Sequence, residues 1–185
     1  MLYEDAARVF RLDNEVLAFR FTATLSHRAE APLERLASPV RLRLWLDAAG
    51  LGPGREVTAG ELASAIALRE TIYRLGVASV RGTSRSADDV AVLNTAAAAG
   101  TPVLALTEDG SAWRLDNNHP VRDAMSVIAQ DAIATLGTER AAQVKTCQGP
   151  DCAGLFLDTS RGLNRRWCSM NTCGNKAKKA RMNQQ

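Results

Sequence analysis

Four cysteines near the C-terminus are the residues whose type and spacing best suit a chemical role. They are Cys147, Cys152, Cys168 and Cys173, and the first 146 residues contain no cysteine. Two Cys-x4-Cys pairs with fifteen residues between them can surround one Zn²⁺ tetrahedrally with four thiolates. The alternative is two disulfides, which form in oxidising compartments. We favour a single structural zinc ion, because nothing in the sequence indicates secretion.

The segment that holds the cysteines has the composition of a small zinc module. Residues 153–157 form a short apolar run typical of a strand, residues 158–164 are rich in turn formers, and residues 165–168 would return as a second strand. A basic helix is expected after the last cysteine. We therefore predict a module resembling a zinc ribbon or treble clef, with Phe156 and Trp167 as its miniature core.

The charge of the chain is unevenly distributed. Residues 145–185 contain eight basic and two acidic side chains, whereas the remainder contains 15 basic and 18 acidic ones, so a net charge of +6 faces one of −3. A basic tail on an acidic body is expected where one end meets a polyanion. The alternative is that the charge only keeps the module soluble. We predict phosphate contacts to nucleic acid, with DNA favoured and RNA kept as the alternative, from Arg161, Arg165, Arg166, Lys176, Lys178, Lys179 and Arg181.

Three stretches of this module resemble the CGNR zinc finger, namely 155–161, 166–170 and 172–176. That finger follows an ABATE domain in bacterial proteins, and residues 67–75 resemble the ABATE domain as well. The resemblance implies a bacterial, stress-induced transcription regulator with one structural zinc and a finger that binds nucleic acid.

The chain departs from the family pattern at three positions. Lys176 stands where the finger has an arginine, which keeps the charge but removes the bidentate fork that grips phosphate or guanine. In the stretch 17–24, Arg20 and Ala23 replace an aspartate and an asparagine of the ABATE pattern. Any role that those two family residues have is not expected here.

The remainder of the chain reads as a mainly helical domain. Ser38 and Pro39 begin one helix, and Thr58-Ala-Gly-Glu61 is a capping box that begins the longest one. Further helices are expected over 86–100 and 120–136, with a short helical turn over 138–143 and a β-hairpin over 102–115. We predict a mainly α fold with one or two small β-hairpins, an ABATE-like domain over 1–143 and the finger over 144–185.

Residues 7–25 carry two competing patterns. Leu17, Phe19 and Phe21 alternate with period two, which favours a half-buried strand, and Asp13-Asn14 could turn a hairpin before it. Leu17, Phe21 and Leu25 also lie on one helical face. The alternation favours a strand, but the sequence leaves strand and helix open over residues 7–25.

Arg69 falls in the middle of the apolar face of the longest helix. A buried guanidinium must be paired with an acid. In the first interpretation Arg69 has a purely structural role: it forms an ion pair with an acid of the domain, or its stem extends so that the guanidinium reaches solvent. The other is an anion-binding arginine in a ligand pocket, with the finger as the output of a small-molecule sensor.

Enzymatic activity is not expected from this sequence. It contains no phosphate-binding glycine loop or nucleophile elbow, and its two histidines, His27 and His119, lie far from the cysteines in the sequence. A site closed by four cysteines lacks the open position of a catalytic metal.

The N-terminus lacks a signal-peptide pattern and no apolar stretch reaches membrane-spanning length, so we expect a cytoplasmic protein. We also consider a finger that serves only structural or protein–protein docking, a small-molecule effector and a homodimer.

Overall fold

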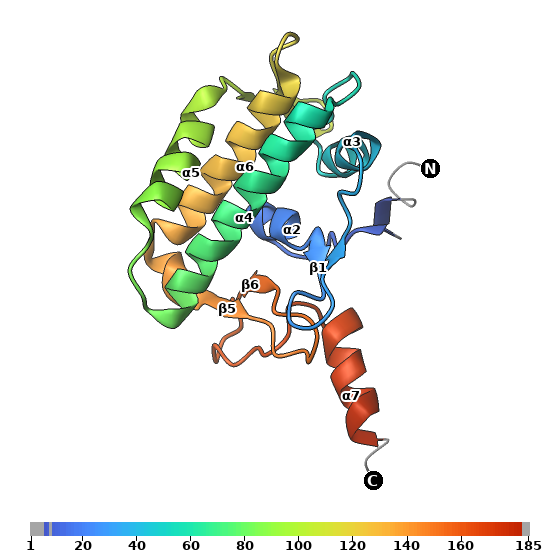
Figure 1. The fold of residues 1–185 in the computed structure, drawn as a ribbon, viewed down its shortest axis with the longest axis vertical. Helices are drawn as coiled ribbons and strands as arrows, with labels where there is room; N and C mark the ends of the chain where they lie inside the picture. Colours follow the sequence, from blue (N-terminus) through green and yellow to red (C-terminus); the bar gives the residue numbers. More distant parts are fainter. Residues whose placement is uncertain (1–5, 8, 183–185) are drawn as a thin grey trace.

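The computed structural model describes residues 6, 7 and 9–182 of the chain. Three long helices, α4 (Ala59–Arg81), α5 (Ala87–Ala99) and α6 (Pro120–Leu136), pack side by side (Figure 1). Two shorter helices, α2 (Leu17–Thr22) and α3 (Pro39–Ala48), pack against this layer from the side opposite α5. The expected mainly helical fold is confirmed.

The helices begin where local capping signals place them. The side chain of Thr58 accepts a hydrogen bond from the backbone of Glu61, and the Glu61 side chain accepts one from the backbone of Thr58, which completes the predicted capping box of α4. Ser38 and Ser86 cap α3 and α5 through their hydroxyls. The aromatic pair Phe21–Trp45, with ring centroids 5.0 Å apart, joins α2 to α3 in the core.

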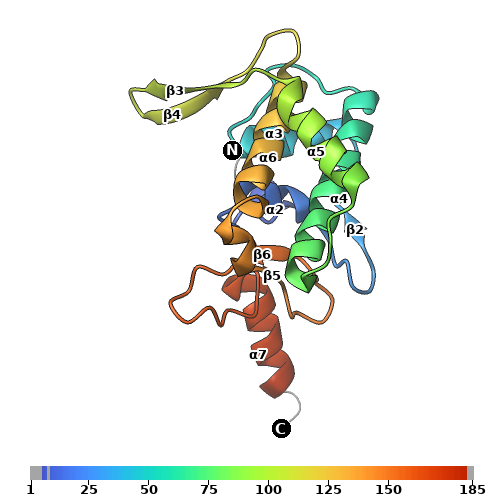
Figure 2. The ribbon, with the colours of Figure 1, turned by 90° about the vertical axis from the view of Figure 1, so that its left-hand side faces the viewer.

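Three two-stranded antiparallel sheets lie in the described part of the chain: β1 (Leu25–Ser26) with β2 (Leu33–Glu34), β3 (Val103–Thr107) with β4 (Gly110–Arg114), and β5 (Val144–Thr146) with β6 (Leu155–Leu157). The β3–β4 hairpin projects from one end of the molecule, as predicted over 102–115, and Asp123 of α6 fixes its base by accepting bonds from the backbone of Thr101 and Asp116. The C-terminal helix α7 (Asn175–Met182) projects from the opposite end (Figure 2).

Of the two patterns left open over residues 7–25, the helical one holds for residues 17–22, which form helix α2, and the strand that the alternation favours there does not form. Ala18, Phe19 and Phe21 are all buried in this helix, so the alternation of large apolar residues does not mark one solvated face. The carboxylate of Asp131 on α6 accepts a 2.8 Å hydrogen bond from the backbone nitrogen of Ala18 and thereby caps the first turn. This cap comes from a residue 113 positions away, so the local pattern does not reveal it.

The pairing predicted inside the zinc module is also corrected. Residues 155–157 form the expected strand, but its partner is β5, which precedes the first cysteine, and not residues 165–168. The β6 strand is buried on both faces, and Val144, Leu155 and Leu157 belong to the main hydrophobic core. Gly76 of α4 makes this packing possible, since a Cβ there would overlap Leu155 Cδ1. The zinc module therefore shares the hydrophobic core of the helical domain.

Two helical turns complete the chain, η1 (Glu139–Gln143) before β5 and η2 (Met170–Gly174), a π-helical turn that leads into α7. Among the described residues, no helix combines the length and the apolar character that a membrane crossing requires.

Candidate metal centre and its basic surroundings

The four cysteine sulfurs lie together although the chain between them is irregular. All four Sγ atoms are within 4.8 Å of one another, and the distances Cys152–Cys168 and Cys168–Cys173 are both 3.7 Å. A tetrahedron with zinc–sulfur bonds of about 2.3 Å has edges of about 3.8 Å. None of the four cysteines is in a disulfide in this structure. The geometry therefore fits one zinc ion bound by four sulfurs and favours it over two disulfides.

Backbone groups orient the first cysteine. The nitrogen of Cys147 donates a 2.8 Å hydrogen bond to the carbonyl of Gly154, which closes the first knuckle. The Sγ of Cys147 accepts from the backbone nitrogens of Gly149, at 3.4 Å, and Cys168, at 3.3 Å. Donors directed at this sulfur favour its thiolate form, which is the form that binds metal.

Asp158 organises the loop that brings the second cysteine pair to the first. Its carboxylate is fully buried and accepts hydrogen bonds from Lys145 Nζ at 2.6 Å, from the Ser160 backbone at 3.0 Å and from the Arg165 backbone at 2.9 Å. Burial alone would raise the pKa of Asp158, but these donors outweigh it and hold the pKa well below its usual range. The charged carboxylate thus fixes the return of the chain toward Cys168.

Among the residues predicted to contact phosphate, the structure separates side chains that are engaged by other groups of the module from side chains without an acidic partner. Arg165 is used inside the module, where it donates to the carbonyls of Trp167 and Cys168 and lies 5.0 Å from the centroid of the Phe156 ring. Arg166 is exposed but donates to the Gln148 side chain, and exposed Lys176 lies 3.4 Å from the carboxylate of Asp151. Among the described residues, no acidic partner is within ion-pair distance of Arg161, Lys178 and Lys179, which are all exposed. The side chain of Arg181 lies outside the described part.

Comparison with family models settles the architecture. The ABATE model, described as "putative stress-induced transcription regulator", matches residues 15–139. The chain belongs to the ABATE family. The CGNR zinc-finger model matches residues 143–185, so the cysteine cluster is the metal site of a CGNR finger and holds one structural zinc. No curated protein matches the chain in a sequence search.

One residue that sequence reasoning missed caps this zinc site. Arg11, which precedes the ABATE match, directs Nη1 at the sulfurs of Cys173, Cys152 and Cys168, at 3.4, 3.5 and 3.7 Å. Its guanidinium covers one face of the sulfur tetrahedron, and Cys147 lies at the opposite vertex. A zinc ion with four thiolates carries a net charge of −2, which the arginine partly neutralises. Arg11 is 141 residues from Cys152, and nothing in its local sequence indicates the contact.

Replacing Arg11 by alanine is expected to weaken zinc binding by about tenfold to a hundredfold, the usual effect of removing a hydrogen-bond partner of metal ligands. Competition with a chromogenic chelator under reducing conditions measures this affinity. Arg11→Lys should fall between the two, because it keeps the charge and lacks the planar fork. Arg43→Ala, at an exposed arginine on α3, is the control. If the Arg11→Ala variant binds zinc as tightly as the unaltered protein does, the contact between Arg11 and the sulfurs does not stabilise the bound metal.

The CGNR finger and the ABATE domain are joined by polar contacts as well as by the shared core. Tyr73 of α4 donates its hydroxyl to the carbonyl of Ala153 at 2.9 Å, and Asn14 donates its amide to the carbonyl of Leu155 at 2.9 Å. His27 lies 3.7 Å from the carboxylate of Asp151 in the first knuckle. The finger is held in a fixed position on the domain by contacts from three separate segments.

The guanidinium of Arg69 is paired with two carboxylates. It makes two 2.7 Å hydrogen bonds to Glu34 and one of 2.7 Å to Glu70, and a further 3.3 Å bond reaches Thr24. Only 2% of its side chain is exposed. This is the structural ion pair, the first of the two interpretations of Arg69. Four of its five N–H donors are engaged within the domain, and its charge is already balanced by two carboxylates. We therefore do not retain Arg69 as a ligand site.

Proposed function

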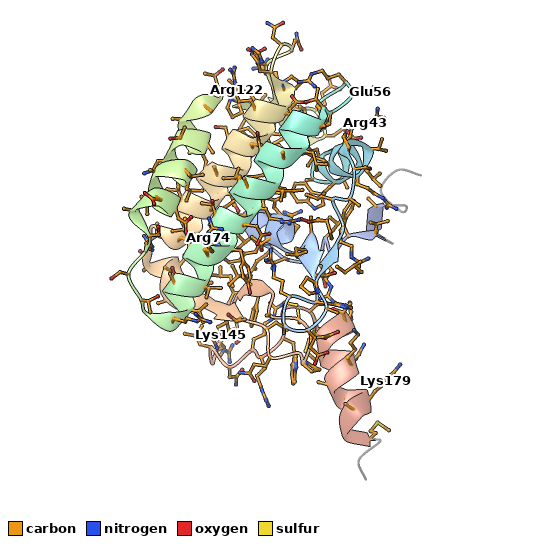
Figure 3. All side chains as sticks on the ribbon, in the orientation of Figure 1. Arg43, Glu56, Arg74, Arg122, Lys145 and Lys179 are labelled. Atoms are coloured by element: carbon orange, nitrogen blue, oxygen red, sulfur yellow. The ribbon has the colours of Figure 1, made fainter. Side chains whose placement is uncertain are left out.

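We propose that this protein is a transcription regulator whose CGNR finger binds nucleic acid through phosphate contacts. The observation that supports the proposal is the helix α7, which projects away from the body and carries Lys178 and Lys179 without acidic partners among the described residues. The side chain of Lys179 extends from α7 and is exposed (Figure 3). Exposed Arg161 lies on the loop that Asp158 folds.

Phosphate contacts of this kind supply affinity and position, whereas bases supply sequence readout. Lysine is a point charge on a flexible stem and suits phosphate without demanding a fixed geometry. Lys176, which replaces the family arginine, is drawn toward Asp151 at 3.4 Å, so its charge is partly compensated within the finger. We therefore assign the main contacts to Lys178, Lys179 and Arg161, and we take duplex DNA as the first ligand to test.

The double substitution Lys178→Gln/Lys179→Gln is expected to weaken binding uniformly across sequences. Removal of two phosphate contacts should reduce the slope of log K against log salt by about 1.4 to 1.8. Fluorescence anisotropy with labelled DNA and RNA, titrated between about 50 and 200 mM salt, measures affinity and slope together.

Arg122→Gln is the matched control for this experiment. It also removes one exposed cation, but Arg122 lies at the end of the molecule opposite α7 (Figure 3). Its affinity and salt slope should equal those of the unaltered protein. If the zinc-loaded, unaltered protein binds neither DNA nor RNA at the lowest salt, the proposal fails.

The docking of the finger supports a second candidate, in which the zinc module is a structural cap of the ABATE domain. Leu155 and Leu157 of the finger lie in the domain's own core. If the finger is only a structural cap, the lysine substitutions should not change nucleic-acid binding, whereas loss of the zinc site should still impair folding. The anisotropy experiment therefore separates the two candidates.

A further inference from the structure

A groove of about 1020 Å³ runs between the ABATE domain and the finger. One wall consists of residues 7 and 9–13 together with His27 and Arg35 of the β1–β2 region. The other wall consists of η2 and α7. We call this feature the junction groove.

Both walls of the junction groove are basic. Lys176, Lys178 and Lys179 line it from α7, and Arg35 lines it from the ABATE domain, whereas Asp13 is the only acidic residue among those that line the described part of it. Cations on two elements that are distant in sequence thus face one space. Such a concave basic surface fits a polyanion better than a flat one does, because charges on opposite sides act on the same backbone.

Arg35 is the residue that most needs explanation. It is half-buried, and its Nε donates a 3.1 Å hydrogen bond to the hydroxyl of Ser26. No partner lies within hydrogen-bond distance of its two terminal nitrogens among the described residues. The other arginines of this region differ, since Arg28 and Arg69 each make a close pair with a carboxylate.

The position of Arg35 suits the capture of a phosphate group. The bond to Ser26 fixes the stem of the side chain, so less entropy is lost when the fork binds a ligand. The free terminal nitrogens can grip two oxygens of a phosphate at once. Val9, Leu12 and Met182 add apolar surface to the groove, which suits the sugar faces between phosphates.

We propose that the junction groove binds the sugar–phosphate backbone of a nucleic-acid strand, with Arg35 of the ABATE domain holding a phosphate opposite the lysines of α7. This inference rests on the proposed function and deepens it. The ABATE domain then contributes directly to binding, and the bound strand touches both domains at once. The rigid attachment of the finger sets the separation of the two walls.

Arg35→Gln in the full-length, zinc-loaded protein tests this proposal. Because the substitution removes one phosphate contact, the salt slope should fall by about 0.7 to 0.9, which corresponds to about fivefold to eightfold weaker binding near 0.1 M salt. Arg35→Lys should restore part of the affinity, because it keeps the charge. Combined with Lys178→Gln, the free-energy effects should add, since the two contacts are separate.

Arg43→Gln on α3 is the control, because Arg43 is exposed, pairs loosely with Asp47 at 3.7 Å and does not line the groove. Thermal unfolding of every variant shows whether the fold is intact. If Arg35→Gln binds with unchanged affinity and slope while the lysine double variant weakens, the groove proposal is overturned and the proposed function stands. If none of the variants binds differently from the unaltered protein, both are overturned.

Discussion

Replacing Cys173 by serine is expected to release the zinc and to unfold the finger. Binding energy at a structural zinc site is folding energy, and it amounts to about 10 to 16 kcal/mol in isolated zinc-finger peptides near neutral pH. The effect should extend into the ABATE domain, because Val144, Leu155 and Leu157 lie in its core. We expect residues 147–173 to become unprotected in amide hydrogen exchange and the thermal midpoint of the whole protein to fall.

Ser169→Ala is the matched control for this substitution. Ser169 is adjacent to Cys168 and is buried, and its hydroxyl has no hydrogen-bond partner among the described residues. Its removal should leave zinc content and amide protection unchanged. A Cys173→Ser protein that keeps the finger ordered without zinc would show that packing on the domain, and not the metal, folds this module.

Arg69→Met is expected to destabilise the ABATE domain by about 3 kcal/mol, at the lower end of the range for breaking a buried ion pair. The substitution keeps the volume of the stem and leaves Glu34 without its cation. The cost stays at the lower end because Glu34 remains 34% exposed and Glu70 keeps a 2.8 Å pair with Arg28. Urea unfolding at neutral pH measures the change.

The same pair makes stability depend on pH with a definite sign. Burial would raise the pKa of Glu34 and the pKa of Glu70. Hydrogen bonds from Arg69 and from the Leu36 backbone outweigh burial at Glu34, and those from Arg28 and Arg69 outweigh it at Glu70, so both pKa values are lowered. A carboxylate with a lowered folded pKa stabilises the protein above its unfolded pKa of about 4.3, and this contribution disappears as the pH falls through the folded pKa. Arg69→Met should therefore flatten the acid side of the stability profile.

Arg43→Met provides the comparison for Arg69→Met. The exposed pair between Arg43 and Asp47 spans 3.7 Å on one helix, and such pairs contribute about 0.3 to 0.5 kcal/mol. If Arg69→Met destabilises the protein by only about 0.5 kcal/mol, the size expected of a surface pair, the buried cluster contributes little.

The helices were predictable because their signals are local. Thr58 with Glu61, and Ser38 with Pro39, specify helix starts through contacts within one turn. The cysteine spacing likewise predicts a shared site, since four ligands for one ion leave few other arrangements. Residues 17–22 were not predictable in this way, because their helix depends on the distant cap from Asp131 and on burial all around.

The missed parts of the site are contacts between segments far apart in sequence. Arg11 reaches the cysteine sulfurs from the other end of the chain. The strand β6 pairs with β5, which precedes Cys147 in the sequence, because both strands pack on α4. The sequence shows that Arg69 must be paired, but it does not reveal that Glu34 is the partner. Arg35 carries no local signal at all, and only the groove sets it apart from other surface arginines.

Native mass spectrometry of the full-length protein, purified under reducing conditions, tests the central claim most directly. We predict one zinc ion per chain and four cysteines that resist alkylation until a chelator is added. A chain that carries no zinc, or one whose cysteines are bonded to each other as disulfides, would contradict this account.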